Sequence, residues 1–154
     1  MRKYVTSYKN ALGLGLGLSK AWYGGIFFKE EGGYEIILKS LNHYKKRLRT
    51  IGNSPEIKDA AAMFASLLQQ EAKKTVPKID ETVKKIHDCL ADTIPLNSLV
   101  EDIPFFQKAL GCYESDIIKA QETGYEYFLN LVGDMDAARN DMVAIKTAQG
   151  KIAE

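Results

Sequence analysis

The chain has 154 residues, of which 45% are hydrophobic and 27% are charged, and its formal net charge is +1. These values are ordinary for a globular protein, so we expect residues 1–154 to form a single domain. No apolar stretch approaches the ~20 residues that a transmembrane helix requires, and the two cysteines, Cys89 and Cys112, do not form a disulfide framework, which favours a cytoplasmic protein.

The small net charge conceals an uneven distribution along the chain. Residues 1–50 hold ten Lys or Arg against three Glu, a balance of +7, whereas residues 51–154 hold eleven Lys or Arg against seventeen Asp or Glu, a balance of −6. Opposite charges favour antiparallel docking of the two segments, either within one chain or between copies. The alternative is that both segments present solvated faces, because exposed charge pairs contribute little stability.

The N-terminal segment, residues 1–33, is rich in glycine. Leu and Gly alternate over residues 12–18 with the period of a strand. In a helix, Gly13, Gly17 and Ala21 would lie four residues apart on one face, which allows another helix to approach closely. We expect the helix, with the strand as the alternative, and we take these three residues as one candidate surface for self-association.

The central segment, residues 34–93, predicts helices. Apolar residues recur every three or four positions in two series, first Tyr34, Ile37, Leu41, Tyr44, Leu48 and Ile51, then Ile57, Ala61, Phe64, Leu68, Ala72, Thr75, Ile79, Val83, Ile86 and Leu90. Gly52 and Asn53 end the first helix, and Ser54 followed by Pro55 begins the next. Because the second series continues across Pro77, we expect one kinked helix there, with two separate helices as the alternative.

The C-terminal segment, residues 98–154, carries the longest apolar series, which runs from Phe106 to Ile152 in steps of three and four. Gly133 and Asp134 are a plausible stop and restart, but the unbroken periodicity favours one long helix that bends there. Such a helix would span about 70 Å, longer than a compact domain of this size, so an elongated, self-associating molecule is the consequence. We take Met135, Met142 and Ile145 as a second candidate surface for self-association.

These patterns together predict an all-α fold, an antiparallel bundle of four to five helices with a long C-terminal helix or helix pair. No family resemblance is evident in the sequence.

Residue types that carry chemistry do not form a recognisable catalytic or metal site. His43 and His87 are the only histidines, no Glu-x-x-His is present, and the glycines match no phosphate-binding motif. We therefore expect no bound metal and no cofactor. The best enzymatic alternative is a small magnesium site on Glu122 and Glu126, which lie four apart on one predicted helix face.

The strongest functional pattern is a cluster of cations in the first central helix, consisting of Lys39, Lys45, Lys46, Arg47 and Arg49. This cluster predicts contact with nucleic acid or another polyanion, unless the acidic C-terminal segment covers it. The leading hypothesis remains a non-enzymatic interaction or adaptor protein that forms a homo-oligomer, most simply a dimer. The polyanion-associated protein and the metal-dependent enzyme are the alternatives.

Overall fold

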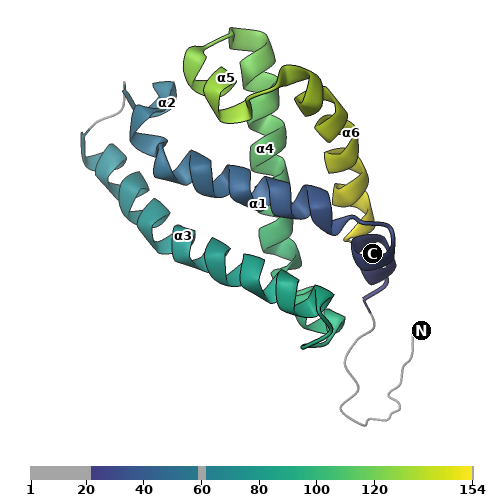
Figure 1. Ribbon diagram of the computed structural model, residues 1–154. Helices are drawn as coiled ribbons and strands as arrows, with labels where there is room; N and C mark the ends of the chain where they lie inside the picture. Colours follow the sequence, from purple (N-terminus) through teal and green to yellow (C-terminus); the bar gives the residue numbers. More distant parts are fainter. Residues whose placement is uncertain (1–21, 59–61, 154) are drawn as a thin grey trace.

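The computed structural model describes residues 22–58 and 62–153, and within these ranges it contains helices and no strand. The predicted all-α fold is confirmed. In chain order the elements shown in Figure 1 are η1 (Ile26–Glu30), α1 (Tyr34–Arg49), η2 (Ile51–Asn53), α2 (Pro55–Lys58), α3 (Ala62–Leu90), η3 (Leu96–Asp102), α4 (Ile103–Thr123), α5 (Glu126–Val132) and α6 (Met135–Lys151).

Helix α1 lies at the centre of the arrangement. It runs antiparallel to α3 on one side, and α4 crosses behind it (Figure 1). Helix α6 returns beside α4 and also packs against α1, while the short helix α5 joins α4 to α6 at one end of the molecule. Because α1 contacts each of the longer helices, its side chains determine how the other elements meet.

The main core is formed where the apolar sides of these helices converge. Phe28, Leu41, Phe106 and Ile145 are among its fully buried side chains. The ring of Phe28 stacks on Phe106, with ring centroids 6.1 Å apart. Near the start of the described chain, the indole N–H of Trp22 donates to the carbonyl of Ile152 at 3.2 Å, which fastens the segment before η1 to the end of α6.

The central helices follow the sequence prediction at several points. Helix α1 begins at Tyr34, and Ser54 Oγ accepts from the backbone N–H of Glu56 at 3.3 Å at the start of α2. Helix α3 continues through Pro77, so the expectation of one helix rather than two is confirmed. Helix α1 ends at Arg49 instead of Ile51, and a turn of 3-10 helix, η2, follows it.

The first turns of α3 depart from the prediction. Phe64 was expected in the core, yet 55% of its surface is exposed, and Met63 and Leu67 are 78% and 55% exposed. The apolar series of α3 becomes buried only from Ala72 onward, where the helix lies against α1. Periodicity alone predicted a buried stripe, but none of the described residues covers this face of the first turns.

The long C-terminal helix is also a wrong prediction. The helix is interrupted at Gly124 and again at Gly133. The φ angles of these glycines, 64° and 78°, lie in a region that disfavours residues with a Cβ. Asp134 then caps α6 by accepting from the backbone N–H groups of Asp136 and Ala137. The periodicity survives because each of the three helices turns its apolar side to the chain's own core, where most positions of the series are buried.

Substitution by alanine should have opposite effects on stability at Gly111 and at Gly124, although both glycines have open space around them. An added Cβ meets no atom within 4 Å at either Gly111 or Gly124, but Gly111 lies inside α4 and Gly124 has a positive φ. Gly124→Ala should therefore lower the free energy of unfolding by about 1 kcal/mol. Gly111→Ala should raise it by about 0.5–1 kcal/mol because it removes a helix-interior glycine. Urea denaturation measures both, and stabilisation by Gly124→Ala would indicate a continuous helix.

Candidate functional site

The cations of α1 face acidic side chains from later in the chain. Lys39 Nζ lies 2.6 Å from Asp141 Oδ2 on α6, and Lys45 Nζ lies 2.6 Å from Asp80 Oδ1 on α3. Arg47 forms ion pairs as well, which are described below. The basic and acidic segments therefore dock within one chain, as one of the two arrangements inferred from the charge distribution requires.

Two further members of the cation cluster are more accessible. Lys46 is exposed and donates from Nζ to the carbonyl of Asn130, near the end of α5, at 3.1 Å. Arg49 is exposed and has no ion pair with a described residue. The five predicted cations thus do not form one open basic surface, because three of them are neutralised by carboxylates.

A buried polar cluster lies where α1 crosses α4, and we call it the Asp116 cluster; it consists of His43, Arg47, Cys112, Tyr113 and Asp116. His43 Nε2 lies 2.8 Å from Asp116 Oδ2, Arg47 Nε lies 3.5 Å from the same oxygen, and Cys112 Sγ lies 3.9 Å from it. The ring of Tyr113 lies against the ring of His43, with centroids 4.6 Å apart. Only 2% of the Asp116 side chain is exposed.

Helical spacing brings these residues together. His43 and Arg47 are one turn apart on α1, and Cys112 and Asp116 are one turn apart on α4, so each pair lies on one side of its helix. The hydroxyl of Tyr113 points to α6 and donates to Asp141 Oδ2 at 2.6 Å. Asp141 therefore receives both this hydroxyl and Lys39, which links the crossing of α1 and α4 to α6.

The electrostatics of the Asp116 cluster favour an arginine ion and a neutral thiol. Burial alone would lower the pKa of Arg47, but the charge of Asp116 and the hydrogen bond to Glu56 outweigh it and raise the pKa. Burial, assisted by the nearby charge of Asp116, raises the pKa of Cys112 to about 12. The Cys112 thiol is therefore protonated at neutral pH and is not an activated nucleophile.

Glu56 connects the buried cluster to the surface. Its carboxylate accepts from Arg47 at 2.5 Å and from Lys119 at 2.6 Å, and the hydroxyl of Ser54 donates to it at 3.0 Å. Partial burial works to raise the pKa of Glu56, but these hydrogen bonds outweigh it and lower the pKa to about 2. Arg47 also donates to the hydroxyl of Tyr127 on α5 at 3.0 Å, so its guanidinium joins four helices.

Three members of the cluster are ligand types for a metal ion. Ligand atoms of His43, Cys112 and Asp116 all lie within 4.8 Å of one another, and no other group of this kind occurs in the described part of the chain. This group is not evident from the sequence, because its members come from helices more than 60 residues apart. The available signal was the spacing of Ser40, His43 and Arg47, a polar series at helical intervals beside the apolar series of α1.

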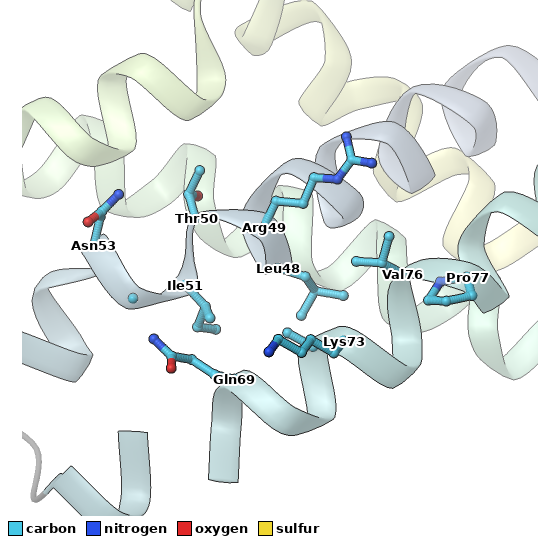
Figure 2. A pocket seen from close by; sticks show the side chains of 11 residues that line it. Leu48, Arg49, Thr50, Ile51, Asn53, Gln69, Lys73, Val76 and Pro77 are labelled. Carbon is cyan, nitrogen blue, oxygen red and sulfur yellow. The ribbon is translucent and has the colours of Figure 1, made fainter. Parts of the chain in front are cut away.

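A groove lies between the end of α1 and α3. It encloses about 500 Å³, and it is lined by Leu48, Arg49, Thr50, Ile51, Gly52, Asn53, Gln69, Ala72, Lys73, Val76 and Pro77. Figure 2 shows Gln69 and Lys73 of α3 opposite Ile51 and Leu48. Its walls are mainly apolar, and none of the exposed residues Met63, Phe64 and Leu67, which we call the α3 stripe, lines it.

The remaining predicted site residues are scattered. Gly13, Gly17 and Ala21 lie outside the described residues. Met135 and Met142 are half-buried, and Ile145 is fully buried in the chain's own core, so a second copy does not reach it in this arrangement.

The two carboxylates of the enzymatic alternative are separated by the break at Gly124. Glu122 lies near the end of α4 and Glu126 begins α5. The prediction that they share one helix face is therefore wrong.

Comparison with known proteins gives no functional indication. No protein-family model, curated protein or solved structure matches the chain. Among the described residues, no helix combines the length and apolar character needed to cross a membrane.

The burial of Asp116 predicts a large effect of removing its charge. Asp116→Asn leaves Arg47 and His43 without their buried carboxylate, and it should lower the free energy of unfolding by about 3 kcal/mol. Asp80→Asn, which breaks the more exposed pair with Lys45, should cost less than about 0.5 kcal/mol. Urea denaturation in the presence of a chelator compares the two variants. Equal costs would contradict the assignment of Asp116 to the core.

The lowered pKa of Glu56 predicts a pH-dependent contribution to stability. Glu56 is stabilised as a carboxylate, so its contribution is complete above its ordinary pKa of 4.5 and is lost as the pH falls from 4.5 toward about 2. Because half of the side chain faces solvent, we expect Glu56→Gln to cost about 1 kcal/mol at pH 7, less than the pKa change alone implies. Unfolding of both proteins between pH 7 and pH 2 should give a difference that shrinks below pH 4.5. A difference independent of pH would refute the ion pairing.

Proposed function

We propose that this protein is a non-enzymatic interaction module that self-associates through the α3 stripe. The observation that carries the proposal is the exposure of three large apolar side chains, Met63, Phe64 and Leu67, on adjacent turns of one helix. Soluble proteins rarely leave such residues clustered on their surface unless another molecule covers them.

A second copy is the occupant that the charge distribution favours. Residues 60–70 include the α3 stripe and contain no charged residue, in a chain of which 27% is charged. In a two-fold dimer each residue near the axis meets its own copy, so a charged surface would repel itself there. An uncharged helix face is free of this repulsion, which supports pairing of α3 with α3 of another chain.

The size of the α3 stripe supports a weak dimer. Its three side chains expose on the order of 400 Å², about half of the roughly 800 Å² that each partner buries in a standard interface. Of the residues first expected to mediate self-association in the C-terminal segment, Ile145 is fully buried and Met135 and Met142 are half-buried, so they add little to this surface. We therefore expect a dimer that forms only at high protein concentration.

The polyanion-associated alternative has less support. Lys39, Lys45 and Arg47 have carboxylate partners within the chain, which leaves Lys46 and Arg49 as the accessible cations of the predicted cluster. Two cations alone give weak binding to a polyanion, because few phosphate contacts are possible. The enzymatic alternative has lost the shared helix face on which it depended.

Sedimentation velocity over a range of protein concentrations tests self-association. The wild-type mass should rise from monomer toward dimer, and Phe64→Glu together with Leu67→Glu should keep the protein monomeric throughout. Val143→Glu is the matched control, because Val143 is another exposed apolar side chain, 70% exposed on α6. The Val143→Glu variant should dimerise as the wild type does.

Either of two results would overturn the proposal. One is a wild-type protein that stays monomeric at every concentration, including several hundred micromolar. The other is a dimer whose concentration dependence is the same in the doubly substituted α3 variant and the wild type. Circular dichroism of each variant verifies that the helices are intact.

A further inference from the structure

We propose that His43, Cys112 and Asp116 form a binding site for a zinc ion at the crossing of α1 and α4. An imidazole nitrogen, a thiol sulfur and a carboxylate oxygen are the three side-chain ligand types that zinc takes in proteins. All three ligand atoms lie within 4.8 Å of one another. The site is independent of the α3 stripe and does not rest on the proposed self-association.

The ligand atoms lie close to the spacing of a tetrahedral site but not at it. With metal–ligand bonds of about 2.0–2.3 Å, neighbouring ligand atoms of a tetrahedral site lie about 3.4–3.7 Å apart. His43 Nε2 and Asp116 Oδ2 are 2.8 Å apart, and Cys112 Sγ and Asp116 Oδ2 are 3.9 Å apart. The first distance has to grow by about 0.6 Å and the second to shrink by a few tenths of an ångström, and the His43 nitrogen and Cys112 Sγ, which lie within 4.8 Å of each other, have to reach the same range. Rotation of the three side chains has to supply these shifts.

The neighbouring arginine is the main physical objection, because its positive charge repels a cation. Arg47 Nε lies 3.5 Å from the oxygen of Asp116 that would bind the metal. The guanidinium has other partners, however, since it also pairs with Glu56 at 2.5 Å and donates to Tyr127 at 3.0 Å. Its charge therefore stays compensated when Asp116 turns to a metal. A Zn²⁺ ion with one thiolate and one carboxylate is itself neutral, and the thiol proton leaves to solvent.

The ligand set also discriminates between metals. Mg²⁺ and Ca²⁺ take oxygen ligands, so a site with sulfur and imidazole nitrogen disfavours both. A mixed set of nitrogen, sulfur and oxygen suits Zn²⁺, for which Co²⁺ is the spectroscopic substitute. Because two ligands come from α4 and one from α1, a bound ion would hold these helices together where the core is most polar.

Titration of the metal-free full-length protein with Co²⁺ tests the site. We expect one equivalent to bind, with a thiolate-to-cobalt charge-transfer band and the visible bands of tetrahedral cobalt. Cys112→Ser should abolish the charge-transfer band, whereas Cys89→Ser should retain it, because Cys89 is buried beside Pro95 and Ser98, away from the site. Zn²⁺ should also raise the melting temperature of the wild type and the Cys89→Ser variant but not that of Cys112→Ser.

The wild type alone can refute the site. A titration that gives no thiolate band and no melting shift at one equivalent would overturn the proposal, even if a variant failed to fold. Retention of the band in the Cys112→Ser variant would also overturn it, because the signal would then not depend on Cys112.

Discussion

The position of α1 depends on one buried carboxylate. Asp116 on α4 receives His43 at 2.8 Å and Arg47 at 3.5 Å, one turn apart on α1, in a place with almost no access to water. Removing charges from water is costly, and the cost is offset only when the partners meet in good geometry. A shift of α1 by one residue would turn both partners away from Asp116. The contacts of His43 and Arg47 with Asp116 therefore specify a single alignment of α1 on α4, and α3 and α6 pack around these two helices.

The same docking accounts for the charge distribution of the chain. Basic residues of α1 meet acidic residues of α2, α3, α4 and α6, so charges that are segregated along the sequence are paired in the folded chain. Three of the five cations that predicted a polyanion-binding surface are thus paired with carboxylates of the same chain. The first turns of α3 are left as an uncharged apolar face, and the proposed self-association relies on that contrast.

The sequence predicted local structure better than it predicted long-range contacts. The helices around Tyr34 and Pro77 were expected, because apolar periodicity and capping residues are local signals. The C-terminal helix was overextended because periodicity persists across Gly124 and Gly133, while the positive φ that breaks the helix is visible only in the structure. The exposure of Phe64 was missed for another reason. Apolar periodicity indicates which helix face can be buried, but it does not indicate whether another element covers that face.

The Asp116 cluster was missed because neither helix contains enough of it to form a motif. His43 and Cys112 were noted separately, and only the crossing of α1 and α4 brings them together. A polar series beside an apolar one, as at Ser40, His43 and Arg47, indicates that polar groups are buried but does not identify their partners. The candidate site is therefore visible only in the folded chain, where His43 and Asp116 meet although 73 residues separate them in the sequence.

The most direct test of this account is whether α1 crosses α4 within one chain. The rings of His43 and Tyr113 lie 4.6 Å apart between centroids, close enough for a nuclear Overhauser effect. We expect this effect in uniformly labelled protein, and its absence in a mixed-label sample that reports only contacts between different chains. A missing effect, or one seen only between chains, would contradict the docking of the basic helix onto its own acidic partners.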